Sequence, residues 1–326
     1  MATQDIGRST DPRLTRHPDG ITAVDAEYVR VGLAAAHIIQ EKDRAAFVDT
    51  GTNDSVPYLL AALDELGIKR NAVDYVFLTH VHLDHAGGAG SLLQYLPNAK
   101  AVVHPRGAPH LIDPGKLVAA SKVVYGEAAF KKLYGELVPI PPDHVILAQD
   151  GQKFSLAGRE LETLHTPGHA LHHYVLMDHA HGNVFTGDTF GLSYREMDTD
   201  KGAFIVPTTT PSQFDPDQLL ASIDRIVSYS PRAAYLMHYS RVTDIPRLAE
   251  NLKSQIREIV RIAKSHAASP GAGKEIAADM RALWLRLARE HGYAQSEESF
   301  DAVLGNDLEL NVQGLEVWLQ RLRPKH

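Results

Sequence analysis

The chain has 326 residues, of which 44% are hydrophobic and 22% charged, and its formal net charge is -7 at pH 7. This length allows a full hydrophobic core and either one large domain or one domain with an appendage. The acidic balance argues against a nucleic acid partner, since such partners require basic surface along the phosphate backbone. The absence of cysteine excludes disulfides, thiolate ligands and a cysteine nucleophile, so nitrogen and oxygen must hold any bound metal.

The N-terminus lacks a positively charged region followed by an apolar run, and no stretch of ~20 apolar residues occurs in the chain. We therefore expect a cytoplasmic protein that has no membrane partner and acts on a small molecule. Residues 1 to about 19 are expected to form an N-terminal segment that is either loose or ordered only by its contacts with the rest of the chain.

Residues 20–104 predict an antiparallel β start followed by a strand, a helix and another strand. The β-branched and aromatic residues that favour strands cluster in short runs, and Asp54 and Ser55 are good N-caps for an amphipathic helix that ends at Gly67. The expected strands are 21–25, 33–39, 45–48, 74–78 and 101–104, and a further helix is expected at 91–96.

Three histidines and one aspartate directly follow the expected strand at 74–78: His80, His82, Asp84 and His85. Side chains alternate along an extended segment, so His80 and His82 point to one side and can bind a single ion. If the chain turns into a helix at residues 86–88, Asp84 and His85 are redirected and can hold a second ion. The spacing therefore suggests a dinuclear site.

Three more strand ends deliver candidate ligands later in the chain. Hairpins are expected at 153–164 and 174–186, and a strand at 233–237 follows a helix that Asp215 caps. The side chains at or just beyond these strand ends are His169, Asp188 and His238. Residues 116–137 fit either one long helix or two short ones.

From about residue 246 the apolar periodicity becomes helical. A break at 269–273 separates two expected helices, and 312–322 indicates a last one. The predicted organisation is one domain at 1–245 and an all-helical extension at 246–326. The extension is expected either to roof the active site or to form the interface of a homodimer.

Five histidines and two aspartates thus form the candidate ligand set. Imidazole and carboxylate suit zinc, iron or manganese. Two divalent ions with both carboxylates and a bridging hydroxide would carry a net charge of about +1, which stabilises an oxyanion, and would lower the pKa of the shared water to ~7. Attack of water on an ester-like bond is the reaction that such a centre favours.

The order of these residues resembles the metallo-β-lactamase superfamily over roughly residues 20–245. The motifs that carry the resemblance are Asp49-Thr50-Gly51, His80-x-His82-x-Asp84-His85, His169, Asp188 and His238. The resemblance implies an α+β fold, an αββα sandwich with the metals at one sheet edge. It further implies that His80, His82 and His169 bind one metal, that Asp84, His85 and His238 bind the other, that Asp188 bridges them, and that Asp49 orients a ligand.

The sequence differs from several well-known branches of this superfamily, and the differences disfavour the activities of those branches. Class B3 β-lactamases share the His-x-His-x-Asp-His turn but lack the bridging aspartate, so Asp188 counts against antibiotic hydrolysis. Neither a nuclease insert nor a flavodoxin-type glycine-rich loop is present in the sequence. The helical extension is similar to that of glyoxalase II, yet the context Met237-His238-Tyr239-Ser240 differs from the Gly-His-Glu context of that enzyme. The segments after Asp188 and the helical extension resemble a hydrolase-like branch that includes an archaeal protein of this fold.

The leading hypothesis is a dinuclear hydrolase in which metal-bound hydroxide cleaves a small thioester, lactone or related ester. Two divalent ions are expected, zinc first and iron or manganese as alternatives. Asp84 is expected to assist proton transfer and Tyr194 to stabilise the oxyanion, while Arg195 could pair with an anionic group. An equally simple interpretation is that Tyr194 packs on its loop and Arg195 is solvated.

Two alternatives stay open. One is a mononuclear non-heme iron dioxygenase acting on persulfides, similar to sulfur dioxygenases that keep the same motif. The other is a non-catalytic effector or binding protein of the same fold.

The remaining histidines near the motif are interpreted as solvated turn residues, with His172 or His173 as the alternative candidates for supporting a ligand. This set is His165, His172, His173, His179 and His181, and His104 and His110 are likewise expected on the surface or in loops.

Overall fold

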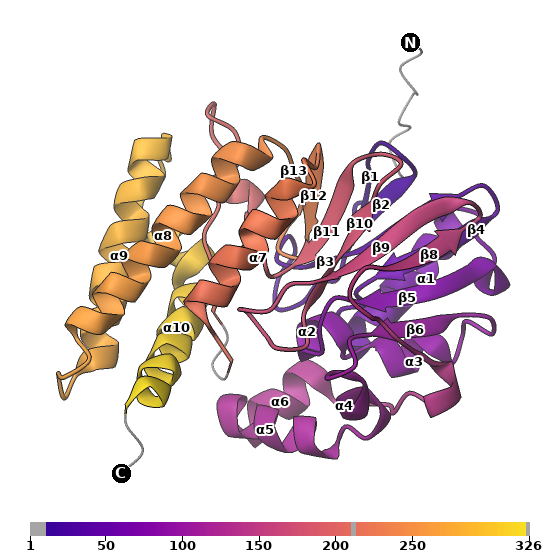
Figure 1. The fold of residues 1–326 in the computed structure, drawn as a ribbon, viewed down its shortest axis with the longest axis horizontal. Helices are drawn as coiled ribbons and strands as arrows, with labels where there is room; N and C mark the ends of the chain where they lie inside the picture. The colour runs from indigo at the N-terminus through magenta and orange to yellow at the C-terminus, as the bar shows by residue number, and fades with distance from the viewer. Residues whose placement is uncertain (1–10, 210–212, 324–326) are drawn as a thin grey trace.

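The computed structural model describes residues 11–209 and 213–323. Two β-sheets lie face to face with helices outside them, and three long helices of the C-terminal region form a further layer beside the second sheet (Figure 1). The αββα sandwich with a helical C-terminal region is therefore confirmed. None of the helices in the described residues is long and apolar enough to cross a membrane.

The first sheet contains seven strands in chain order. Its first four strands pair antiparallel, and strands β4 to β7 pair parallel, so the carboxyl ends of β4 and β5 meet at one edge. The strands are β1 (Leu14–Arg16), β2 (Ile21–Asp25), β3 (Ala35–Glu41), β4 (Arg44–Val48), β5 (Val73–Leu78), β6 (Lys100–Val103) and β7 (Val145–Leu147).

The second sheet has six strands in the order β13-β12-β11-β10-β9-β8. Strands β11 and β12 pair parallel and the other neighbours antiparallel, so β9, β11 and β12 run in one direction and end at one edge. The strands are β8 (Gln152–Leu156), β9 (Arg159–His165), β10 (Tyr174–Asp178), β11 (Asn183–Gly187), β12 (Ala233–Leu236) and β13 (Ser240–Val242).

Helices cover both outer faces. The α-helices are α1 (Val56–Glu65), α2 (Leu83–Ala86), α3 (Ala89–Leu93), α4 (Ala108–Ile112), α5 (Gly115–Tyr125), α6 (Glu127–Tyr134), α7 (Pro216–Ser228), α8 (Ile245–Ser265), α9 (Ala272–His291) and α10 (Glu297–Leu322). Short 3-10 turns occupy Asn53–Ser55, Arg70–Ala72, Pro142–His144 and Arg195–Met197.

The alternation of β5 divides its side chains between two cores. Phe77 enters the core between the two sheets, whereas Val76 and Leu78 pack beneath α1 and α3. A third core joins the second sheet to α7 and to the three C-terminal helices, where Trp284 is fully buried. The predicted boundary at 245/246 coincides with the start of α8, and the division into two domains stays a prediction.

Two local expectations, on the N-terminal segment and on the last helix, were wrong, and the choice left open at 116–137 between one long helix and two short ones was decided in favour of two. A short strand, β1, lies within the N-terminal segment and pairs with β2. Residues 116–137 form two helices because Gly126, at φ +80°, breaks the helical path between them. The last helix begins at Glu297 rather than near residue 312, since the Ser296 side chain accepts a hydrogen bond from the Ser299 N–H and caps it.

A buried ion pair in the second sheet gives a stability prediction. Arg159 Nη2 lies 2.6 Å from Asp178 Oδ2, and both side chains are buried. Replacing Arg159 by methionine leaves the Asp178 carboxylate buried without its cation, so we expect a loss of about 3 to 5 kcal/mol in the free energy of unfolding, measured by urea denaturation. The neighbouring Lys153 to Glu160 pair is exposed, so Lys153→Met should cost less than about 1 kcal/mol. Equal losses in both variants would contradict this account.

Candidate metal centre

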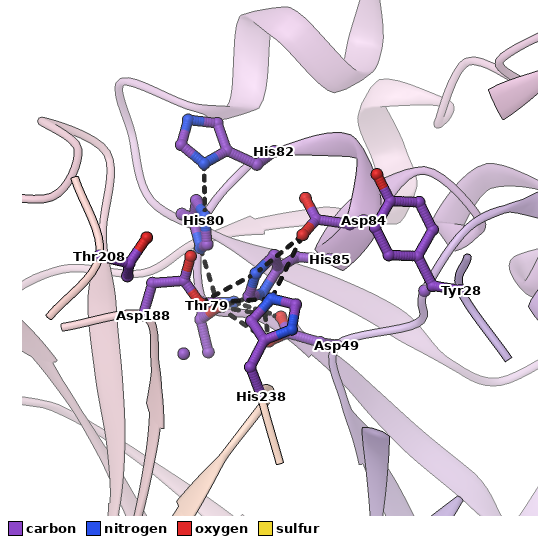
Figure 2. Close-up of polar contacts among 12 residues, drawn as sticks. Tyr28, Asp49, Thr79, His80, His82, Asp84, His85, Asp188, Thr208 and His238 are labelled. Carbon is purple, nitrogen blue, oxygen red and sulfur yellow. Dashed lines mark hydrogen bonds and ion pairs between the residues drawn. The ribbon is translucent and has the colours of Figure 1, made fainter. Parts of the chain in front are cut away.

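Four strand ends, one from the first sheet and three from the second, converge on a single site between the sheet edges. The chain leaves β5 into the motif at 80–85, and it leaves β9, β11 and β12 towards His169, Asp188 and His238. Parallel orientation within each sheet explains the convergence, because the carboxyl ends of parallel strands share an edge. The structure brings all seven predicted ligands together in two groups. Figure 2 labels His80, His82, Asp84, His85, Asp188 and His238 among them.

The first group comprises His80, His82, His169 and Asp188, whose donor atoms lie within 4.8 Å of one another. Nε2 of His80 is 2.8 Å from Nδ1 of His82, and Nε2 of His169 is 3.2 Å from the same Nδ1. Nε2 of His169 also lies 3.2 Å from Oδ2 of Asp188. Three ring nitrogens and a carboxylate oxygen therefore face one small volume.

The second group comprises Asp84, His85 and His238. Oδ2 of Asp84 is 3.3 Å from Nε2 of His238 and 3.7 Å from Nε2 of His85. The other oxygen of Asp188, Oδ1, lies 3.2 Å from Nε2 of His85. Asp188 thus lies between the groups, with one carboxylate oxygen directed at each.

Two atoms of the cluster test whether it fits a cation. Nε2 of His85 and Oδ1 of Asp188 are buried and lie 3.2 Å apart, yet neither forms a hydrogen bond to any described residue. Buried polar atoms are nearly always satisfied, so two such atoms at one point call for a partner. Imidazole nitrogens and carboxylate oxygens are the donors that zinc, iron and manganese accept, and the cluster therefore fits divalent metal.

The first group is poised to offer nitrogen lone pairs. Burial lowers the pKa of His82 to about 3 and that of His169 to about 4, and it lowers the pKa of His80 well below 6.5. These imidazoles are therefore neutral at physiological pH, as metal ligation requires.

Charge dominates in the second group. Burial by itself lowers the pKa of both histidines in this group. The carboxylates of Asp188 and Asp84 nevertheless raise the pKa of His85 well above 6.5, and Asp84 raises the pKa of His238. Burial by itself raises the pKa of Asp84, but the neighbouring His85 and His238 lower it to about 2. A divalent ion would take the place of these protons, so metal binding at this group should weaken as pH falls.

Asp49 holds His85 in place, as the resemblance implied. Its Oδ2 is 3.0 Å from Nδ1 of His85, and its Oδ1 accepts hydrogen bonds from the backbone N–H and the hydroxyl of Thr79. Asp49 is buried and follows β4 directly, so it joins two neighbouring strand ends of the first sheet. This contact directs Nε2 of His85 at the centre.

His173 is buried behind the centre, so the interpretation as a solvated turn residue was wrong for it and the alternative that it supports a ligand is the one that its contacts favour. Its Nε2 accepts a hydrogen bond from the Asp188 N–H at 3.2 Å, and its Nδ1 lies 2.9 Å from the hydroxyl of Thr166. The ring stacks on His80 with 4.9 Å between centroids. The sequence did offer a signal that His173 is buried, because it directly precedes the expected strand that begins at Tyr174, and that strand is buried throughout.

Two other histidine expectations were also wrong. His172 and His104 are 7% and 6% exposed and therefore belong to the interior rather than the surface. By contrast, His165, His179 and His181 are partly or fully exposed, as predicted.

The structure places Tyr194 and Arg195, which were proposed near the substrate, in polar contacts of their own, as it does Tyr239 beside His238. The Tyr194 hydroxyl donates a hydrogen bond to Oδ1 of Asp307 on α10, at 3.2 Å. Arg195 pairs with Asp198 and donates to Ser193, and the Tyr239 hydroxyl is 3.5 Å from Asp25. The role of Tyr194 at an oxyanion stays a prediction.

Asp307 gives a prediction about pH and stability. Burial raises the pKa of Asp307 to about 6, against the opposing charge of His238. The native state therefore holds this proton more tightly than the unfolded chain, so the stabilising contribution is complete below about pH 4 and is lost as pH rises through about 6. We expect Asp307→Asn to stabilise the metal-free protein by up to about 3 kcal/mol at pH 8 and to have little effect at pH 4.

Thermal unfolding at the two pH values measures this difference. Glu309→Gln, an exposed change on the same helix, is the matched control and should alter neither value. Equal stabilisation by Asp307→Asn at both pH values would contradict the titration of Asp307.

Comparisons with known proteins agree with this fold and site. A model of the metallo-beta-lactamase superfamily matches residues 29–238. The metallo-beta-lactamase fold-containing protein ST1585 of Sulfurisphaera tokodaii is 28% identical over 229 residues, which cover 69% of this chain and 78% of that one. Hydroxyacylglutathione hydrolase of Aeromonas hydrophila is 30% identical over 153 residues, 47% of this chain and 44% of that enzyme. The match therefore spans less than half of the hydrolase.

Solved structures show the same architecture. The archaeal protein ST1585 from Sulfolobus tokodaii has a TM-score of 0.64 at 23% identity, with 92% of this chain and 99% of that chain covered. A metallo-beta-lactamase family protein, TTHA1429 from Thermus thermophilus, has a TM-score of 0.62 at 21% identity, with 88% of each chain covered. With the histidine and aspartate cluster, the family match and the hydrolase relative support a metal-dependent hydrolase. The chain belongs to the metallo-β-lactamase superfamily.

Proposed function

We propose that the protein is a dinuclear metal-dependent hydrolase that cleaves a small thioester, lactone or related ester. The observation that carries this proposal is the position of Asp188, whose Oδ2 faces His169 and whose Oδ1 faces His85. A carboxylate that directs one oxygen at each of two donor groups is suited to bridge two ions.

In this proposal the two donor groups hold one ion each. His80, His82 and His169 would bind the first, Asp84, His85 and His238 the second, and Asp188 both. A pair of bound divalent ions, with zinc expected and iron or manganese also suited to these donors, would supply hydroxide at neutral pH and polarise a carbonyl oxygen.

The protein's own side chains perform the remaining tasks. Asp49 and His173 hold His85 and the Asp188 backbone, which keeps the two donor groups aligned. The Asp84 side chain is 20% exposed, so its carboxylate is the member of the second group that substrate can reach. We assign it the transfer of a proton from the attacking water to the leaving group.

The relatives support an acyl substrate. Hydroxyacylglutathione hydrolase acts, by its name, on an acyl derivative of glutathione, and the match to it covers 47% of this chain. The context around His238 differs from that of glyoxalase II, so we infer acyl transfer to water without committing to glutathione. The net charge of -7 also makes a polyanionic nucleic acid a poor substrate.

A substrate panel tests the proposal. Metal-loaded protein should hydrolyse members of a thioester and lactone set and leave phosphodiesters intact. Failure to cleave any carboxylic ester, thioester or lactone would overturn the proposal, as would oxygen consumption with a persulfide substrate.

The alternative of a mononuclear iron dioxygenase has one observation in its favour. His80, His82 and Asp188 belong to one group, and two histidines with a carboxylate are the ligands of many non-heme iron oxygenases. That alternative leaves Asp84, His85 and His238 without a task, which is why we favour two ions. The non-catalytic alternative would leave all seven candidate ligands without a chemical role.

We further propose that the partner is a small molecule and that neither nucleic acid nor membrane is bound. A homodimer is a separate proposal, which light scattering tests directly: a mass close to 35.8 kDa would exclude it.

A further inference from the structure

Three tyrosines gather on the side of the centre where Asp84 lies. Tyr28 is in the segment after β2, Tyr125 ends α5 and Tyr134 ends α6. The rings of Tyr28 and Tyr134 stack with 6.1 Å between centroids, and Tyr125 meets Tyr134 edge-on at 5.6 Å. We call these three residues the tyrosine cluster.

The tyrosine cluster is attached to the metal motif itself. Leu83, which separates His82 from Asp84, shares a small apolar core with Phe130 and Tyr134, and Tyr28 packs against that core. Figure 2 shows the Tyr28 ring beside Asp84. Helices α5 and α6 therefore pack against the metal motif and lie next to the candidate metal centre.

The cluster also presents a hydrogen-bond donor. The hydroxyls of Tyr28 and Tyr134 are 2.6 Å apart. Each phenol carries one proton, and only one of the two can lie between the oxygens, so the other is directed away from the pair. A phenol loses its proton only at about pH 10, so both hydroxyls are protonated at neutral pH.

Exposed apolar side chains lie next to the cluster in the chain. Helix α5 has no buried side chain, and its Val123 and Val124 are 86% and 43% exposed. Val29 and Val31, next to Tyr28 in the chain, are 64% and 70% exposed. Val124 directly precedes Tyr125 and Val29 directly follows Tyr28 in the chain, so exposed apolar side chains flank two of the three tyrosines, and exposed apolar groups that gather at one place are typical of a binding site.

Resting on the hydrolase function proposed above, we propose that the tyrosine cluster and the C-terminal end of α5 form the subsite for an apolar acyl group of the substrate. A scissile carbonyl at the metal centre extends its acyl group over the neighbouring wall. Tyr134 is buried and supports this wall, whereas Tyr28 and Tyr125 are partly exposed, and aromatic faces with polar tips suit an apolar chain attached to a carbonyl. The substrate class is therefore an ester or thioester with a medium-length aliphatic or ring-bearing acyl group. The hydroxyl donor beside Asp84 favours this occupant over a second copy of the chain, which would need only the valines.

Thioesters that share one thiol and carry acyl chains of two to ten carbons test the subsite. For the metal-loaded enzyme we expect kcat/KM to rise about two- to fourfold per methylene until the wall is covered. Tyr125→Ser should lower kcat/KM about tenfold for the eight-carbon substrate and leave the two-carbon substrate within about twofold, because roughly one aromatic face is lost. Tyr28→Phe keeps the ring and should raise KM about three- to tenfold.

Tyr95→Ser is the matched control, since Tyr95 is 54% exposed and lies outside the small apolar core around Tyr134. It should leave the whole series unchanged. A flat dependence on chain length in the wild type, or an equal loss for all chain lengths in Tyr125→Ser, would overturn the subsite while leaving the hydrolase proposal standing.

Calorimetric titration of metal-free protein with acetate, hexanoate and octanoate separates the two proposals. Tighter binding of the longer carboxylates, lost in Tyr125→Ser, supports the subsite even if no thioester is cleaved. A Val123→Ser variant that dissociates a dimer without changing the chain-length dependence would show that a second copy covers this surface and would overturn the inference.

Discussion

Asp188→Ala is expected to lose bound metal and hydrolytic turnover together. Its two carboxylate oxygens face Nε2 of His169 and Nε2 of His85, each at 3.2 Å, so one substitution removes a donor from both groups. The loss in metal affinity and in kcat/KM should exceed the roughly 10- to 100-fold cost of losing an outer partner of a ligand. Elemental analysis of the purified variant and a thioester assay on the same sample measure the two effects.

The control for this variant is Asp200→Ala, an exposed aspartate that belongs to neither donor group. It should keep wild-type metal content and turnover. A normal metal content in Asp188→Ala would show that this carboxylate is not a ligand, and normal turnover would remove it from the reaction.

Asp49→Ala should weaken metal binding while leaving every predicted ligand in place. The Asp49 carboxylate forms hydrogen bonds with Nδ1 of His85 and with the backbone N–H of Thr79. Its removal therefore allows the imidazole to rotate and leaves the turn before His80 without this support. We expect a roughly 10- to 100-fold loss in metal affinity. Competition with a chelator, followed by residual activity, measures this loss.

Excess metal distinguishes positioning from unfolding in this experiment. If Asp49 only orients His85, activity should return when metal is added in excess, and the circular dichroism spectrum should match the wild type. Asp43→Ala, at the exposed turn between β3 and β4, should resist the chelator as the wild type does. Wild-type resistance in Asp49→Ala would contradict the assigned role.

The parts of the fold that were predictable from sequence are those in which local pattern and burial agree. The run at 74–78 alternates between two cores, and the four ligands after it are close in sequence, so strand and motif could be recognised together. His169, Asp188 and His238 were placed by their positions at later strand ends, and the parallel pairing of β11 with β12 brings two of those ends side by side.

The missed features depend on contacts between distant segments. His173 supports Asp188 only because β10 pairs between β9 and β11, and Tyr28 meets Tyr134 across 106 positions of sequence. The role of Tyr194 at an oxyanion was predicted because Tyr194 follows Asp188 closely, and it stays a prediction. Its bond to Asp307 on α10 could not be foreseen, since nothing local indicates where the C-terminal helices pack.

The geometry gives each sheet a distinct part in the centre. The first sheet supplies the consecutive motif and its support by Asp49, while the second supplies single side chains at three strand ends. Because the ligands come from both sheets, binding of metal is expected to stabilise the native state as well as to enable the reaction.

Element-resolved metal content of protein purified without added metal tests the central claim most directly, when thioester hydrolysis and oxygen uptake are recorded on the same sample. The two-metal account predicts two divalent ions per chain and thioester cleavage with no oxygen consumed. One iron per chain, with oxygen consumption and no hydrolysis, would contradict it.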